Sequence, residues 1–251
     1  MFTWLHKLGS PPLLYRVAGR STPWFKWTAF LLLALGLVGG LILAPPDYQQ
    51  GDGFRIIYVH VPSAILSLAV FVLMAVAGAI GLIWRLRMAH AVAVAAAPLG
   101  AAFTFITLIT GSLWGKPMWG TYWAWGPRLT SELVLLFLYF GYIAVINAFP
   151  NQRSGDRAGA IFAIIAAVDI PIIHYSVYWW TSLHQGASLS FTNSSISPAM
   201  LWPLLVMIVA FTLYFCWLLS IRLRTEILRR ERRASWVRTL TITGAKNAKL
   251  A

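Results

Sequence analysis

Two histidines, His60 and His184, have the residue type and the placement to hold one metal ion between them. Each stands at one end of a long apolar run, and we expect the two ends to lie at the same level of the molecule. Neutral imidazole is the commonest metal ligand in proteins. Only Asp47 and Asp52 could add ligands nearby, so a closed tetrahedral zinc site is poorly supported. Either histidine alone fits a surface hydrogen-bonding role, but the pair suits an iron ion whose other ligands come from a macrocycle.

The segment WGKPMWGTYWAWGPRLTSE, from Trp114 to Glu132, carries five large rings within twelve residues. Tryptophan and tyrosine collect at membrane–water boundaries, which accounts for isolated rings such as Trp24 and Trp27. So dense a cluster, interleaved with glycines that allow tight turns, predicts instead a loop over residues 114–128 that stacks on a flat apolar ligand. The five rings are Trp114, Trp119, Tyr122, Trp123 and Trp125.

The same segment ends in a positive charge. Gly126 and Pro127 are suited to the N-cap and first position of a helix, which places Arg128 in the first helical turn. Free backbone N–H groups and the helix dipole attract carboxylates there. Arg55 in an earlier loop adds a second cation, and Glu132, one turn after Arg128, is expected to pair with it. Together with the rings and the histidines, this indicates haem, with its propionates near Arg128.

The chain that positions these residues is a membrane protein. Its 251 residues are 59% hydrophobic and only 11% charged, whereas about a quarter of the residues of a soluble domain are charged. Runs of about 20 apolar residues can cross a bilayer as helices. Six such runs predict an all-α, six-span fold, with spans near residues 24–44, 57–84, 91–113, 129–149, 158–180 and 199–221. Residues 1–221 would form this domain and residues 222–251 a basic tail.

The net charge of +13 is explained by membrane topology and does not indicate nucleic-acid binding. Lys and Arg collect on the cytoplasmic side of membrane spans. Of the 20 basic residues, 17 fall before the first span, after the last one, or in the second and fourth loops, and only Arg55, Lys116 and Arg128 fall in the other loops. Both termini are therefore expected in the cytoplasm and the histidine site on the opposite face. We interpret the basic tail as part of this cytoplasmic surplus of charge, with binding to anionic lipids or a cytoplasmic partner as the alternative.

Cysteine chemistry is not expected. The single cysteine, Cys216, lies inside the sixth run, and the chain contains neither CxxC nor CxxCH. Disulfide exchange, iron–sulfur ligation and covalent haem attachment are therefore excluded as functions of this chain, and any haem would be held non-covalently. Asp169 and His174 lie deeper in the fifth run, away from the expected site, and we interpret Asp169 as forming a buried interhelical hydrogen bond.

Three stretches together resemble a known family. WGKPMWGTYWAWGPRLTSELVLLFLY is similar to the tryptophan-rich "WWD" signature of haem-handling membrane proteins, and RIIYVHVP and DIPIIHYSVYWWTSLHQG resemble the CcmC family of bacterial cytochrome c maturation. The similarity runs over nearly the whole chain. It implies a protein of the bacterial inner membrane that binds b-type haem at its periplasmic face. It further implies delivery of that haem to the chaperone CcmE, alongside the ABC transporter subunits CcmA and CcmB and the small protein CcmD.

The resemblance also assigns residue roles. His60 and His184 match the two haem-ligand histidines of the family, four tryptophans match its signature, and Arg128 matches the arginine that follows. Gly126 and Pro127 stand where the family usually has an acidic and a small residue, and Tyr122 replaces a tryptophan. The tyrosine keeps an aromatic face, whereas the missing acid leaves only Glu132 to pair with the arginine.

We therefore expect a haem-delivery protein that is not an enzyme, in which the protein positions the cofactor. One alternative is a transporter subunit that moves haem across the bilayer, but polar residues within the spans are scarce apart from Asp169 and His174. The other is a haem-bearing quinol oxidoreductase. That function would require histidine pairs at two depths, and His174 has no evident partner toward the cytoplasm.

Overall fold

The computed structural model describes residues 9–184 and 195–240, and these residues are mostly helical. Six helical segments are long and apolar enough to cross a membrane, which confirms the predicted number of spans. The first and last extend beyond their expected limits because their helices continue into the basic ends of the chain. The segments are Pro11–Leu43, Asp52–Ile83, Arg87–Trp119, Pro127–Asn147, Gln152–Trp179 and Pro198–Arg230.

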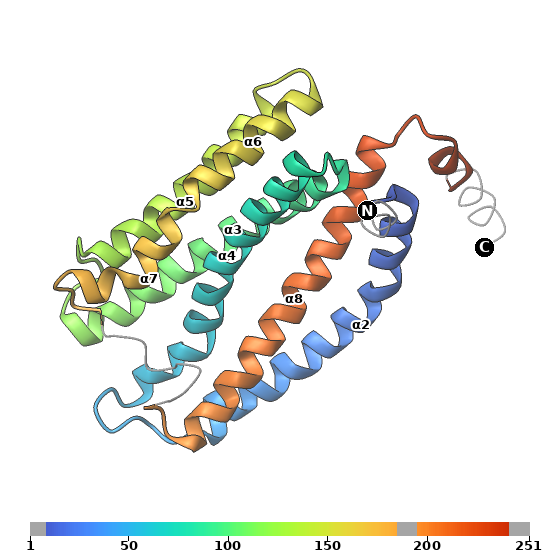
Figure 1. Cartoon of the computed structure of the whole chain (residues 1–251). Helices are drawn as coiled ribbons and strands as arrows, with labels where there is room; N and C mark the ends of the chain where they lie inside the picture. The colour runs from blue at the N-terminus through green and yellow to red at the C-terminus, as the bar shows by residue number, and fades with distance from the viewer. Residues whose placement is uncertain (1–8, 185–194, 241–251) are drawn as a thin grey trace.

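The helices are arranged as an elongated bundle (Figure 1). Helix α2 (Pro11–Val38) packs along α8 (Pro198–Arg230), although the two come from opposite ends of the sequence. Helices α3 (Ile57–Ile83) and α4 (Arg87–Trp119) pack together and form the middle of the bundle. The remaining helices cover its other side: α5 (Pro127–Asn147), α6 (Gln152–Ala166) and α7 (Asp169–Trp179). Helix α8 crosses the domain boundary expected at residue 221, so the first part of the basic tail belongs to the sixth span.

The central core is held by close helix contacts. Tyr139 of α5 is fully buried, and its hydroxyl donates a hydrogen bond to the backbone carbonyl of Ser67 in α3 over 2.7 Å. Its ring packs against Gly100 of α4, where a Cβ atom would collide with it. Large apolar side chains such as Leu31 and Ile42 point outward instead, as expected for helices that face lipid hydrocarbon.

The fifth span is divided into α6 and α7 by a short turn at residues 167–168. Pro171 explains this break, because it has no N–H group to donate to the carbonyl of Ala167 and its ring crowds that carbonyl. The backbone N–H of Ile170 bonds to Ala167 over 3.1 Å in a tighter turn. Helix α7 then ends at Trp179, so His184 follows the helix in an irregular segment, as predicted.

The expected aromatic loop over residues 114–128 is shorter than predicted. Helix α4 continues to Trp119, so Trp114 and Trp119 project from a helix and only residues 120–126 are non-helical. Gly120 ends α4 in a left-handed conformation with φ of 76°, and its N–H bonds to the carbonyl of Lys116 over 3.0 Å. Helix α5 begins at Pro127 with Gly126 as its N-cap, as predicted.

Candidate functional site

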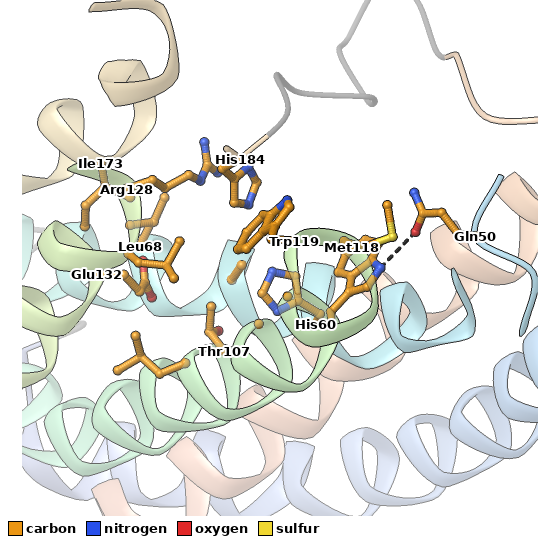
Figure 2. A pocket seen from close by; sticks show the side chains of 16 residues that line it. Gln50, His60, Leu68, Thr107, Met118, Trp119, Arg128, Glu132, Ile173 and His184 are labelled. Carbon is orange, nitrogen blue, oxygen red and sulfur yellow. Dashed lines mark hydrogen bonds between the residues drawn. The ribbon is translucent and has the colours of Figure 1, made fainter. Parts of the chain in front are cut away.

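A cavity of about 100 Å³ lies where α3, α4 and α5 meet the segment after α7. It brings together six of the residues singled out in the sequence, and Figure 2 shows five of them by label. Residues from Gln50 to His184 line it, so the cavity is assembled from four spans and the first loop. The residues singled out in the sequence that line it are His60, Trp114, Trp119, Arg128, Glu132 and His184.

His60 is held in one orientation by Thr110 of the neighbouring helix α4. The His60 Nδ1 atom lies 3.0 Å from the Thr110 hydroxyl oxygen, and His60 is only 9% exposed. Thr110 donates its own hydroxyl proton to the carbonyl of Ile106 over 2.6 Å, so its oxygen accepts from His60. The imidazole proton therefore resides on Nδ1, which leaves the lone pair of Nε2 available for a metal ion.

Trp114 connects this histidine to the first loop. Its indole Nε1 donates a hydrogen bond to the side-chain oxygen of Gln50 over 2.8 Å, drawn as a dashed line in Figure 2. Its ring meets the His60 ring edge-on, with centroids 5.6 Å apart. The hydrogen bond and the ring contact together fix one wall of the cavity.

Trp119 and His184 form a wall between two cavities. Their ring centroids are 6.2 Å apart, and both residues line the cavity described above and a second one of about 250 Å³. The second cavity is also lined by Trp125, which is 78% exposed. The two aromatic rings therefore separate an inner space at His60 from an outer space at Trp125.

Arg128 lines the inner cavity from the first turn of α5, as predicted, but its expected partner does not pair with it. No ion pair joins Arg128 to Glu132 among the residues that the structure describes. Glu132 is buried, and its Oε1 atom has no hydrogen-bond partner there. The predicted ion pair is therefore not formed, although the two side chains remain close enough to interact electrostatically.

Three other predicted residues do not line either cavity. Arg55 binds the carbonyl of Gly40 over 2.7 Å and the carboxylate of Asp52 over 2.9 Å, so it fastens the first loop to the end of the first span. Tyr122 is 56% exposed and lies under Lys116 in a cation–π contact. Trp123 packs edge-on against Trp125, with centroids 5.5 Å apart. These residues shape the surroundings of the site from outside it.

Comparison with known proteins identifies the family. A family model described as CcmC, Heme exporter protein C, matches residues 4–238. The chain belongs to this family. Membership confirms the resemblance seen in the sequence motifs.

Relatives of this heme exporter C chain are similar over nearly their full length. Heme exporter protein C of Escherichia coli (strain K12) is 50% identical over 242 residues, covering 96% of this chain and 98% of the relative. The Haemophilus influenzae protein of the same name is 46% identical over 244 residues, covering 97% and 99%. The Rhodobacter capsulatus protein is 38% identical over 227 residues, covering 90% and 94%.

Family membership and the six apolar helices make the chain a multi-pass protein of the bacterial inner membrane. Heme exporter C proteins handle haem and are not enzymes, so the expectation of a non-enzymatic protein is confirmed.

Two residues beside the candidate site were not singled out in the sequence. Thr110 and Gln50 orient His60 and Trp114, yet single threonine and glutamine residues at these positions carry no sequence signal. Thr110 lies one helical turn before Trp114, but this spacing alone does not identify it as the partner of His60, which depends on how α3 packs on α4. Asp169 and His174 remain outside the cavity. His174 is exposed, and the buried Oδ2 atom of Asp169 has no partner among the described residues, so the expected hydrogen bond is not seen at that atom.

Proposed function

We propose that this chain binds haem in the cavity between α3, α4 and α5, with His60 and His184 as the two axial ligands of the iron. One observation carries the proposal: two histidines from distant parts of the sequence line one cavity, and the hydrogen bond from His60 to Thr110 frees Nε2 for a metal. The donor set suits the six-coordinate iron of haem, which needs two axial imidazoles and no acidic ligand. Trp114 and Trp119 offer aromatic faces to the macrocycle, and Arg128 offers a cation to the propionates.

The size of the cavity sets a condition on binding. About 100 Å³ is below the roughly 300 Å³ at which sites begin to enclose drug-sized ligands. In this proposal Trp119 and His184 change orientation when haem binds, which joins the inner space to the outer one of about 250 Å³. His184 follows a helix in an irregular segment, whereas His60 is buried inside a helix. His184 is thus the ligand that can move, and it is the one that would yield when haem leaves.

We infer from the distribution of charge that this site faces the periplasm. Basic residues are frequent at the start of α2 and the end of α8, which lie together, and by the positive-inside tendency this end of the bundle faces the cytoplasm. Haem bound at the other end would be presented to the periplasmic chaperone CcmE for cytochrome c maturation, in a complex with CcmA, CcmB and CcmD. The exposed ring of Trp125, beside the outer cavity, is suited to contact a partner protein. Delivery is favoured over transport across the bilayer because the cavity lies at one end of the spans.

The proposal is tested by absorption spectroscopy of the protein purified with haem. His60→Ala and His184→Ala should each replace the low-spin spectrum of a two-histidine haem with that of a site that has lost one axial ligand. His174→Ala is the matched control, because His174 is an exposed histidine of the same span that does not line the cavity. If both ligand variants kept the parent spectrum, the assignment of the two histidines would be wrong.

A further inference from the structure

A third cavity, of about 910 Å³, lies at the opposite end of the bundle from the candidate haem site. It is formed by the end of α3, the first turns of α4 and α6, and the end of α8. Its lining is basic, with five arginines and two acids. The arginines are Arg85, Arg87, Arg153, Arg157 and Arg230.

The chain has too few acids to neutralise these arginines. It contains seven Asp and Glu residues, all within the described ranges. Two lie in the first loop and two are buried in spans at a distance from this cavity, which leaves Asp156, Glu226 and Glu231 at this end.

The three acids at this end already have partners. Arg230 binds Asp156 through two hydrogen bonds of 2.7 and 2.8 Å, and Glu226 also contacts Arg230. Glu231 lies 3.9 Å from Arg87. None of the ion pairs found among the described residues includes Arg85, Arg153 or Arg157. Three arginines at the cavity rim therefore form no ion pair with an acid of this chain.

The backbone adds no net positive field. Helices α4 and α6 begin at this cavity, at Arg87 and Gln152, but α3 and α8 end there, so the positive ends of two helix dipoles are opposed by the negative ends of two others. The floor beneath the rim is neutral overall, because the buried Arg230 is matched by its carboxylate partners. The unmatched charge is therefore concentrated at the rim, where a ligand can reach it.

The cavity opens beside apolar side chains that face lipid. Ile83 and Trp84 are 68% and 38% exposed and immediately precede Arg85, and Phe149 is 43% exposed two residues before α6's N-cap. The rim thus lies where hydrocarbon gives way to headgroups. We propose that this basic cavity binds a phosphate group, for which the headgroup of an anionic phospholipid is the nearest source.

The chemistry of the lining favours phosphate. The planar guanidinium group of arginine binds phosphate oxygens through paired hydrogen bonds, and the rim supplies such groups from the α3–α4 turn and from α6. The positive-inside tendency alone would explain basic residues on this side of the membrane, but it would not require them to converge on one cavity. The concave arrangement distinguishes a site from a diffuse charged surface. This proposal does not depend on haem binding at the other end of the bundle.

The experiment uses native mass spectrometry of the full chain in detergent, titrated with phosphatidylglycerol, with zwitterionic phosphatidylethanolamine, or with pyrophosphate. The test variant is Arg85→Gln/Arg153→Gln/Arg157→Gln. The matched control is Arg20→Gln/Arg232→Gln/Arg233→Gln, which removes three exposed arginines at the same end that do not line the cavity. Helical content measured by circular dichroism would show that both variants fold. If the test variant does not fold, the single substitution Arg153→Gln takes its place.

We expect the parent and the control to retain phosphatidylglycerol, and the test variant to bind it at least about tenfold more weakly, since each basic residue near an anionic headgroup contributes about fivefold. If pyrophosphate bound with the same dependence on the three arginines while phosphatidylglycerol did not, the phosphate site would stand and its source would be a soluble compound. Equal losses in the test and control variants, or no loss in either, would overturn the proposal.

Discussion

The His60 Nδ1 atom lies 3.0 Å from the hydroxyl oxygen of Thr110, and this contact joins a candidate metal ligand on α3 to the neighbouring helix α4. Thr110 can only accept in this contact because its own proton is donated to the carbonyl of Ile106. The tautomer of His60 is therefore set by a helix that supplies no metal ligand itself. Such partners of ligating histidines fix the orientation of the ring and raise its basicity as a ligand.

Removing the Thr110 hydroxyl should weaken haem binding. Thr110→Val keeps the shape of the side chain but removes the acceptor for His60 Nδ1, so we expect haem affinity to fall by about 10- to 100-fold, as for other partners of metal ligands. The measurement is a haem titration followed by absorbance. Thr110→Ser restores the hydroxyl and should bind as the parent does. Equal affinity of the valine variant would show that this contact does not orient the ligand.

Arg128 should act through the propionates of haem. Arg128→Gln removes a charged donor at the cavity, and we expect about tenfold weaker binding, the effect of losing one charge-assisted hydrogen bond. The dimethyl ester of haem carries no propionate charge, so the parent and the variant should bind it equally.

Arg55→Gln is the control for Arg128, because Arg55 binds Gly40 and Asp52 instead of lining the cavity. It should leave the difference between haem and its ester unchanged. If Arg55→Gln abolished the difference in affinity between haem and its dimethyl ester, Arg55 would also contact the propionates, as the sequence had suggested.

Much of the fold could be predicted from the sequence because the bilayer imposes simple requirements. Runs of about 20 apolar residues fixed the number of spans, and Gly126 followed by Pro127 located the start of α5. The end of α4 was misjudged because the cluster of rings and glycines from residue 114 onward suggested a loop. Pro117 costs only one hydrogen bond so close to the helix end. Gly115 is needed for packing, since a Cβ atom there would lie 2.9 Å from the Trp119 ring.

The site could be predicted only in part. Four residues of the cavity were predicted from their types: His60, His184, Trp119 and Arg128. Histidine suits the iron, tryptophan the macrocycle and arginine the propionates of haem. Arg55 binds the carbonyl of Gly40, fifteen positions earlier, in the π-helical turn at Gly39–Leu43. No local sequence pattern predicts this contact. The partners of His60 and Trp114 depend on how α3, α4 and the first loop pack, so they required the three-dimensional arrangement.

The hydrogen bond between Trp114 and Gln50 should stabilise the haem-free protein. Gln50→Leu leaves the indole N–H without its partner, and we expect the free energy of unfolding to fall by about 1 kcal/mol. A double-mutant cycle with Trp114→Phe, measured by denaturant unfolding in mixed micelles, should give a coupling energy of similar size. Gln49→Leu alters an exposed neighbour and should have little effect. A coupling energy near zero would mean that the bond contributes nothing to stability.

The buried pair of Arg230 and Asp156 should contribute far more to stability than the exposed pair beside it. Their side chains are 5% and 10% exposed, and two hydrogen bonds join them. Asp156→Asn leaves a buried guanidinium with incomplete compensation, so we expect a loss of about 3 kcal/mol in the free energy of unfolding. Glu231→Gln removes the acid that lies 3.9 Å from Arg87, a side chain 71% exposed, and should cost about 0.5 kcal/mol. Equal losses in the two variants would mean that Glu226 alone can hold Arg230, and that the link from α6 to α8 is not required at this end of the bundle.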